Sequence, residues 1–95
     1  MAELAGKVAI ITGGGTGIGR GIALVMAREG ATVICTDIVP DNAEETAAAV
    51  RAAGGRAEVL AQDVTKWDSC RDVADKVLAA HGRIDILVTN AAGYR

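Results

Sequence analysis

The fold is decided by the stretch Val8-Ala9-Ile10-Ile11-Thr12-Gly13-Gly14-Gly15-Thr16-Gly17-Ile18-Gly19. Its first four residues form a continuous apolar run, which is typical of a strand that is buried on both faces. The run then passes into a glycine-rich turn. Beyond the turn, apolar residues recur at helical spacing, at Ile18, Ile22, Val25 and Met26. We therefore expect a strand, a tight turn and a helix in direct succession, with Gly30 ending the helix.

The rest of the chain repeats this alternation of strand and helix patterns. Apolar or β-branched runs at 32–36, 56–61 and 84–88 predict three more strands. An alanine-rich segment at 43–53 and an apolar stripe over 70–81 predict two more helices. The order β-α-β-α-β-α-β with short connections predicts an α/β fold with a parallel sheet.

Two of the expected helices carry capping signals at their start. Asp41 is followed three residues later by Glu44, and Thr65 is followed at the same distance by Asp68. This spacing is typical of a capping box, in which side chains bond the free N–H groups of the first turn. We therefore expect side-chain N-caps at both places.

The composition of the chain excludes several classes of protein. With 95 residues, 51% hydrophobic content, 23% charged content and a net charge of −2, the chain suits one globular domain and argues against disorder or nucleic-acid binding. No apolar run approaches the roughly 18 residues that a membrane helix needs. Cys35 and Cys70 form neither a disulfide framework nor a metal-binding spacing, which favours a reducing cytoplasm and no metal site.

The glycine-rich turn has the composition of a phosphate-binding loop. One glycine allows the tight turn, a second lets backbone N–H groups approach a pyrophosphate, and a third lets helix and strand pack closely. The helix start adds free N–H donors and partial positive charge. Since a glycine string alone also fits a flexible loop, the flanking strand and helix carry this prediction. No Gly-Lys-Ser/Thr sequence closes the turn, so a P-loop is excluded.

Asp37 is the second candidate site residue. It lies at the expected end of the second strand, eighteen residues after Gly19. Dinucleotide-binding proteins carry an acid at about this distance to hold the adenosine ribose hydroxyls. A carboxylate there repels a 2′-phosphate, and neither Thr16 nor Ile38 is basic, which favours NAD over NADP. An acid in a solvated turn is the alternative.

Together these features resemble the N-terminal, cofactor-binding part of the classical short-chain dehydrogenase/reductase family. The resemblance covers essentially the whole chain and rests on the loop at 12–19, on Asp37, on the pair Asp63-Val64 and on the stretch 82–91. It implies a Rossmann-type parallel sheet in the strand order 3-2-1-4, truncated before strand five. On this view residues 1–95 are a single half-domain, and the catalytic C-terminal part is absent.

The resemblance also assigns residues to the cofactor. It implies that the loop borders the pyrophosphate and nicotinamide, that Asp37 meets the adenosine ribose, and that Asp63 and the residue after it meet the adenine. The full expected set is Gly13, Thr16, Gly17, Ile18, Gly19, Asp37, Ile38, Asp63, Val64, Asn90, Ala91 and Ala92. Its last turn, which begins at Thr89, departs from the family's Asn-Asn-Ala-Gly at the first and fourth positions.

Catalysis in this family requires Ser, Tyr, a Lys four residues after the Tyr, and a further Asn. The resemblance places all of them beyond residue 95. We therefore expect no catalytic residue in this chain and assign no such role to Ser69 or Tyr94. The expected function is NAD(H) binding for an oxidoreductase that acts on an alcohol or carbonyl substrate, with the chain inert by itself.

Two other functions remain open at this point. One is a stand-alone nucleotide-binding module or an inert truncation product; the other, a less good fit, is a methyltransferase-like Rossmann protein. In the expected sheet the fourth strand exposes an apolar edge, which predicts self-association or a C-terminal partner there. Arg20 in the first helix either reaches a phosphate or serves a solvent-facing structural role. His81 suits a structural role at a helix C-terminus.

Overall fold

The computed structural model describes residues 2–15 and 17–90 of the chain. Within them it contains seven elements in the predicted order: β1 Val8–Thr12, α1 Gly17–Arg28, β2 Thr32–Asp37, α2 Pro40–Ala52, β3 Arg56–Ala61, α3 Trp67–His81 and β4 Ile86–Thr89. No helix in this part of the chain is long and apolar enough to cross a membrane.

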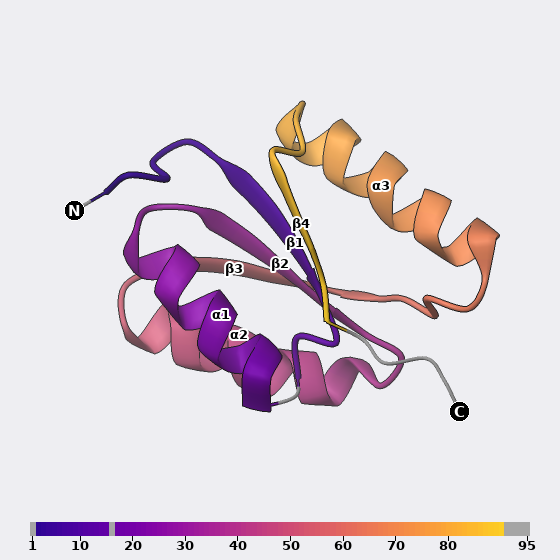
Figure 1. Cartoon of the computed structure of the whole chain (residues 1–95), viewed down its shortest axis with the longest axis horizontal. Coiled ribbons are helices and arrows are strands. Elements are labelled where there is room, and N and C mark those ends of the chain that lie inside the picture. Colours follow the sequence, from indigo (N-terminus) through magenta and orange to yellow (C-terminus); the bar gives the residue numbers. More distant parts are fainter. Residues whose placement is uncertain (1, 16, 91–95) are drawn as a thin grey trace.

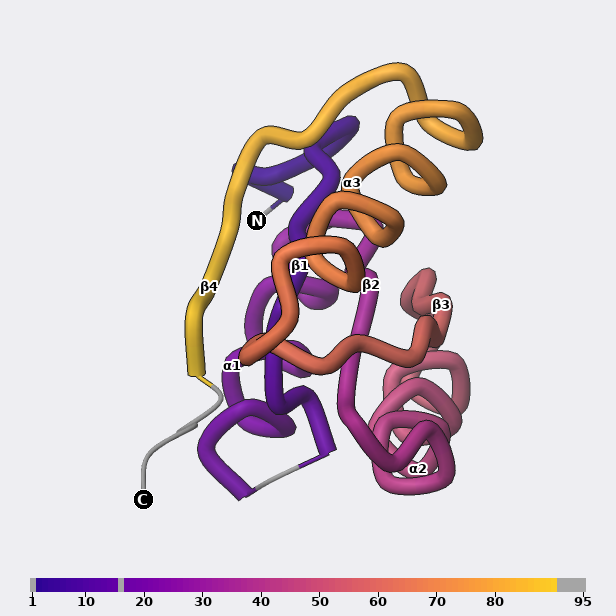
Figure 2. Tube along the Cα trace, turned by 90° about the vertical axis from the view of Figure 1, so that its right-hand side faces the viewer, coloured from indigo at the N-terminus to yellow at the C-terminus, as the bar shows by residue number. Residues whose placement is uncertain are grey.

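The four strands form one parallel sheet in the order β3-β2-β1-β4, which confirms the predicted fold and strand order (Figure 2). Helices α1 and α2 cover one face of this sheet, and α3 lies on the other (Figure 1). All five residues of the inner strand β1 are buried, as expected for a strand covered on both faces. In the described part of the chain, β4 pairs with β1 alone and forms one edge of the sheet.

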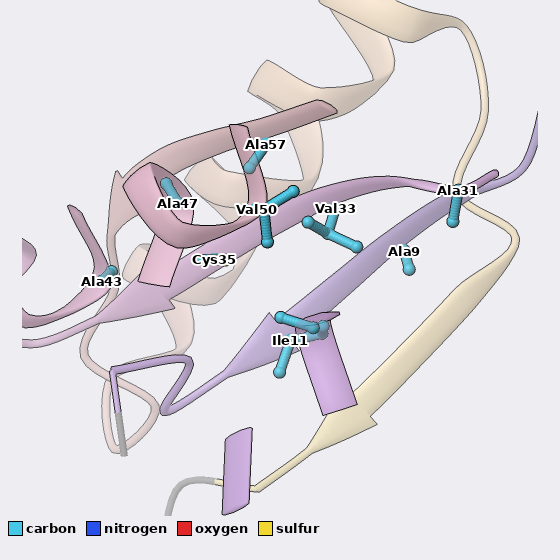
Figure 3. Packing of buried hydrophobic residues seen from close by; sticks show 10 residues of the cluster. Ala9, Ile11, Ala31, Val33, Cys35, Ala43, Ala47, Val50 and Ala57 are labelled. Atoms are coloured by element: carbon cyan, nitrogen blue, oxygen red, sulfur yellow. The ribbon is translucent and has the colours of Figure 1, made fainter. Parts of the chain in front are cut away.

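Successive residues of β1 serve two separate cores. Ala9 and Ile11 pack in the cluster under α1 and α2, whereas Val8 and Ile10 pack with residues of α3. Figure 3 shows the first cluster, in which α2 contributes small side chains such as Ala47 toward the sheet. This alternation follows from the strand period of two, which sends neighbouring side chains to opposite faces.

Helix α1 buries only part of the predicted apolar stripe. Its buried positions are Gly19 and Ala23. By contrast, Ile18 and Val25 of the apolar stripe are 73% and 53% exposed. Ile22 and Met26 of the same stripe are partly buried against the core, so α1 approaches the sheet through these side chains together with its small residues.

Neither predicted side-chain N-cap forms. The N-cap residue of α2 is Val39, which Pro40 follows at the start of the helix, and that of α3 is Lys66; neither makes a side-chain cap bond. Proline suits the first helical position because it has no N–H group to satisfy, so α2 begins before Asp41. The hydroxyl of Thr65 donates to Oδ1 of Asp63, and the start of α3 has no side-chain cap bond.

The fourth strand begins at Ile86, two residues later than predicted. Just before it, the carboxylate of Asp85 accepts a hydrogen bond from the N–H of Val8 at 2.8 Å. The Asp85 N–H in turn donates to the Val8 carbonyl at 2.9 Å. Because a side chain takes the first N–H of β1, the regular ladder begins one residue further along, at Ala9 and Ile86.

The end of α3 confirms the predicted glycine stop. Gly82 has φ = 77° at the C-cap and donates its N–H to the Leu78 carbonyl. The preceding residue, His81, places its Nε2 atom 2.9 Å from Oε2 of Glu58 in β3. This is an ion-pair distance without hydrogen-bond alignment. His81 therefore has a structural position between α3 and β3.

Candidate functional site

The described members of the expected set gather at the carboxyl ends of the strands and at the start of α1. This is the edge at which parallel α/β sheets bind their ligands. There the hydroxyl of Thr12 donates to the Val88 carbonyl at 3.2 Å and accepts from the N–H of Asn90 at 3.0 Å. The ends of β1 and β4 are thereby held together, next to the glycine turn.

Asn90 and Gly19 both lie against the carbonyl group of Gly13. The Asn90 side-chain amide donates to the Gly13 carbonyl at 3.2 Å. A Cβ at Gly19 would collide with that same carbonyl oxygen and would lie 2.8 Å from Nδ2 of Asn90. Gly13 itself has φ = 64°. The structure thus brings three expected residues together and leaves space only for glycine at position 19.

Gly14 and Gly15 stand outside the expected set, although the turn depends on both. A Cβ on Gly14 would lie 3.0 Å from Cβ of Cys35 in β2. A Cβ on Gly15 would lie 2.5 Å from Cβ of Asn42 and 2.6 Å from its carbonyl carbon, in α2. The turn is therefore wedged between β2 and α2. The run of three glycines was the only signal of this packing in the sequence.

Asp37 ends β2 with a carboxylate that its own turn holds in place. Its Oδ1 accepts a hydrogen bond from the N–H of Val39 at 3.0 Å, as in an Asx turn. No hydrogen bond or ion pair joins the other oxygen, Oδ2, to a described residue. The carboxylate is thus oriented by its own turn through one oxygen.

Asp63 is held even more firmly, at the end of β3. Its Oδ1 accepts from the hydroxyl and the backbone N–H of Thr65, at 2.6 and 3.0 Å. These two bonds, the hydroxyl first, lower the pKa of the Asp63 carboxyl below its ordinary value. The Asp63 N–H donates to Oγ of Ser69 at 2.8 Å. Ser69, the only serine of the chain, therefore positions this loop, a role that the sequence analysis missed.

The remaining members of the expected set are less constrained. Ile18 and Ile38 are both largely exposed. Val64 is half-buried and lines a hollow of about 300 Å³ between α3 and the sheet. Gly17 begins α1, where nothing lies within 4 Å of the place a Cβ would take. Thr16, Ala91 and Ala92 lie outside the described residues.

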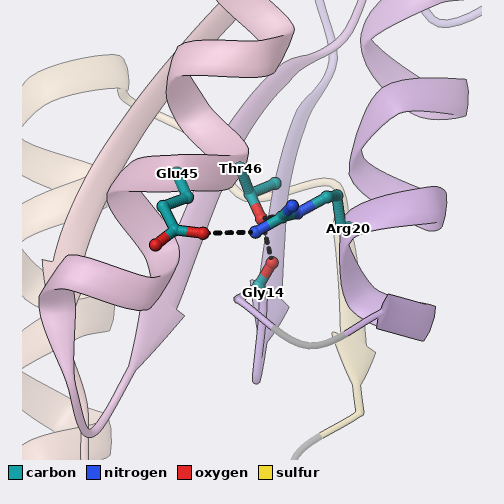
Figure 4. Close-up of polar contacts among 4 residues, drawn as sticks. All are labelled: Gly14, Arg20, Glu45 and Thr46. Carbon is teal, nitrogen blue, oxygen red and sulfur yellow. Dashed lines mark hydrogen bonds and ion pairs between the residues drawn. The ribbon is translucent and has the colours of Figure 1, made fainter.

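Arg20 is engaged by α2, as Figure 4 shows. Its Nε donates to the Thr46 hydroxyl at 3.1 Å, and its Nη2 meets Oε1 of Glu45 at 3.2 Å. The Thr46 hydroxyl in turn donates to the Gly14 carbonyl at 2.6 Å. Of the two predicted roles, the structure therefore favours the structural one, in which Arg20 joins α1 to α2 beside the glycine turn.

Comparison with solved structures finds the same architecture in oxidoreductases. The chain superposes on a hydroxysteroid dehydrogenase from Escherichia coli with a TM-score of 0.92 and 40% identity, covering 97% of this chain and 39% of that one. A metagenomic short-chain oxidoreductase in complex with NADP gives a TM-score of 0.90 and 41% identity, over 97% and 41% of the two chains.

Curated sequences lead to the same group of proteins. The chain is 48% identical over 91 residues to the uncharacterized oxidoreductase YxbG of Bacillus subtilis, covering 96% of this chain and 33% of that protein. It is 39% identical over 87 residues to the short-chain dehydrogenase/reductase homolog YusS of the same organism, covering 90% and 80%. The chain thus spans about a third of the length of most of these relatives, whereas YusS is of similar length.

The family comparison agrees with the geometry of the site. Residues 7–95 match the family described as short chain dehydrogenase, which is nearly the whole chain. The matched region includes the glycine turn and the acids at the ends of β2 and β3. From its sheet order, its site and this match, the chain belongs to the short-chain dehydrogenase family.

Proposed function

We propose that this chain binds NAD as the cofactor-binding part of an oxidoreductase that acts on an alcohol or carbonyl carbon. The observation that carries the proposal is the Asp37 carboxylate, which is oriented by its turn and retains one oxygen beyond it. NAD, when bound, supplies the hydride chemistry, and the protein binds and orients it. The small-molecule substrate belongs to the intact enzyme.

The residues present fit a dinucleotide. A Cβ would collide with neighbouring atoms at positions 15 and 19 of the glycine turn and would be tightly packed at position 14, so the turn is built for bare backbone, which suits close approach by a phosphate group. Asp37 supplies an acceptor for ribose hydroxyls at the end of the neighbouring strand. The resemblance gives Asp63 the adenine amino group, and its Oδ2 has no partner among the described residues.

The charges around Asp37 support NAD over NADP. A 2′-phosphate on the adenosine ribose would meet the Asp37 carboxylate. The next residue, Ile38, is exposed and apolar, so it offers no cation. Arg20 is paired with Glu45 and Thr46. The NADP in the metagenomic relative belongs to that protein, and direct titration of both dinucleotides decides the matter here.

The test is calorimetric titration of NAD and NADP into the native-length protein and its Asp37→Ala variant. We expect wild type to prefer NAD. Loss of the carboxylate should weaken NAD binding about ten- to a hundredfold, as for one hydrogen bond to a charged group, and should reduce the ratio by which NAD is preferred over NADP. Asp41→Ala is the matched control, because Asp41 lies nearby in the first turn of α2. An unchanged NAD/NADP ratio in Asp37→Ala would count against this role.

A stand-alone nucleotide-binding module is the second candidate function. One observation favours it: the relative YusS is similar in length to this chain. The intact mass of the protein from its native source separates the two functions. A mass near 9.6 kDa with NAD binding but no turnover supports the module; a mass more than twice as large, with turnover, supports the enzyme. The family match excludes the methyltransferase-like alternative.

A cytoplasmic location is part of the same proposal. Both cysteines are free thiols. Burial raises the pKa of the Cys35 thiol to about 11, so it stays protonated and unreactive. Free thiols in a protein of this kind are typical of a reducing compartment.

A further inference from the structure

The first peptide of the glycine turn, between Gly13 and Gly14, is held from both sides. Its N–H, on Gly14, donates to the Thr36 carbonyl of β2 at 2.9 Å. Its carbonyl, on Gly13, accepts from the Asn90 side chain at 3.2 Å. The orientation of this peptide is therefore set by the ends of β2 and β4.

The second peptide, between Gly14 and Gly15, is held from one side. Its carbonyl accepts the 2.6 Å bond from the Thr46 hydroxyl of α2 (Figure 4). Because a trans peptide is planar, the Gly15 N–H points in the opposite direction, away from Thr46. No described residue accepts a hydrogen bond from this N–H. The contact with Thr46 thus determines where the turn presents a backbone donor.

Arg20 determines which way the Thr46 hydroxyl points. Thr46 is fully buried, and its hydroxyl has a single proton. A guanidinium only donates, so the 3.1 Å contact from Nε occupies a lone pair of the Thr46 oxygen. The hydroxyl proton is then directed to the Gly14 carbonyl. The ion pair with Glu45 holds Arg20 in this position.

We propose that Thr46, oriented by Arg20, is a positioning residue for the cofactor: by holding the Gly14 carbonyl, it directs the Gly15 N–H toward the phosphates of the dinucleotide. This inference rests on the proposed function and adds a part of α2 to the phosphate site. It differs from a packing role for Thr46, in which volume alone would matter.

Two substitutions of Thr46 separate the hydroxyl from the volume. Thr46→Val keeps the shape and removes the hydroxyl, whereas Thr46→Ser keeps the hydroxyl and removes a methyl group. For native-length protein, the dissociation constant for NAD is measured by calorimetry and the midpoint of thermal unfolding is measured alongside it. NADP replaces NAD if it is the dinucleotide that wild type binds.

If Thr46 positions the turn, Thr46→Val binds the dinucleotide about tenfold more weakly, the effect of one misplaced hydrogen bond. Thr46→Ser then binds within about twofold of wild type, even where its thermal midpoint is lower. Equal weakening in both variants, or wild-type affinity in folded Thr46→Val, would overturn the inference and leave the proposed function intact. Failure of wild type to bind either dinucleotide would overturn both.

Arg20→Met tests the orienting step, with Arg51→Met as its control. Arg51 forms an ion pair with Glu44 at 2.8 Å within α2, also donates to the Ala57 carbonyl of β3, and does not contact the turn. We expect Arg20→Met to weaken binding by less than Thr46→Val, because the hydroxyl can still reach Gly14. The double variant should then be no weaker than Thr46→Val alone. Additive losses would show that Arg20 acts separately, and would overturn its role through Thr46.

Discussion

Asp85 joins the residues before β4 to the start of β1 and carries a pH-dependent part of the stability. Arg83 meets its two carboxylate oxygens at 2.7 and 2.8 Å, and the Val8 N–H adds a third bond. These contacts, Arg83 first, lower the pKa of the Asp85 carboxyl. Since the native pKa is lowered, the carboxylate stabilises the fold above the unfolded-state value of about 3.9. This contribution is lost as the pH falls through the native pKa.

Asp85→Asn should therefore lower the free energy of unfolding at pH 7, and the difference from wild type should shrink as the pH falls below about 4. Urea unfolding of both proteins between pH 7 and pH 2.5 measures this difference in the free energy of unfolding. Asp75→Asn serves as the control, because Asp75 meets Arg71 at 3.9 Å on an exposed helix surface, where pairs contribute little. A difference between Asp85→Asn and wild type that stays constant over this range would contradict the assignment.

At the scale of the element, two glycines of α1 differ in the space around them, so substitution by alanine should have opposite effects on stability. Gly19 faces the turn, where a Cβ would strike the Gly13 carbonyl, whereas nothing lies within 4 Å of a Cβ on Gly21. Gly19→Ala should lower the free energy of unfolding by about 1–3 kcal/mol, the usual effect of overpacking, and should weaken NAD binding. Gly21→Ala should raise the free energy of unfolding by about 0.5–1 kcal/mol, because alanine has a higher helix propensity than glycine.

Chemical denaturation and NAD titration of the two variants check this pair. The two substitutions add the same methyl group to the same helix, so helix propensity alone predicts stabilisation in both. A stabilised Gly19→Ala variant with normal NAD affinity would show that the turn can move away from α1.

At the scale of the molecule, the two faces of the sheet are covered unequally. One face carries both α1 and α2, whereas the other carries α3, beside the hollow that Ile10, Val73 and Leu87 help to line. Leu87 is 60% exposed on the edge strand β4. An apolar edge next to an apolar hollow favours association.

The 95-residue chain should therefore self-associate with increasing concentration, and Leu87→Lys should reduce this association. Sedimentation velocity over a hundredfold concentration range measures it. Leu78→Lys is the matched control, because Leu78 is 47% exposed on α3 and does not line the hollow. If both substitutions reduce self-association equally, the added charge acts by raising solubility in general, and association does not depend on a contact at β4.

The elements and their order could be predicted because they depend on local patterns. Apolar runs, helical stripes and glycines specified seven elements, and alternating order then required a parallel sheet. The errors lie where local patterns compete with distant contacts. Thr65 has the residue type of an N-cap, yet its hydroxyl bonds Asp63. Ile18 lies on the predicted apolar stripe of α1 but is exposed, whereas Ile22 and Met26 of the same stripe pack against the core.

Of the candidate site residues, Asp37 was expected from its position after a strand, whereas Asp63 and Asn90 came from the family resemblance. The structure brings all three to one edge of the sheet, because the carboxyl ends of parallel strands meet there. The contacts that α2 makes with the glycine turn could not be predicted, because no local sequence pattern indicates them. The bond from Thr46 to Gly14 spans 32 residues, and that from Arg20 to Thr46 spans 26.

By itself, then, the sequence determined the α/β class and the succession of elements, since periodicity and spacing act over short stretches of chain, while the family resemblance supplied the strand order. Only the tertiary structure decided which residues of the α1 stripe are buried, why a side chain at position 15 would collide with α2, and what orients the turn. These depend on the shape and hydrogen-bonding groups of a helix distant in sequence, which become neighbours of the turn only when the chain has folded.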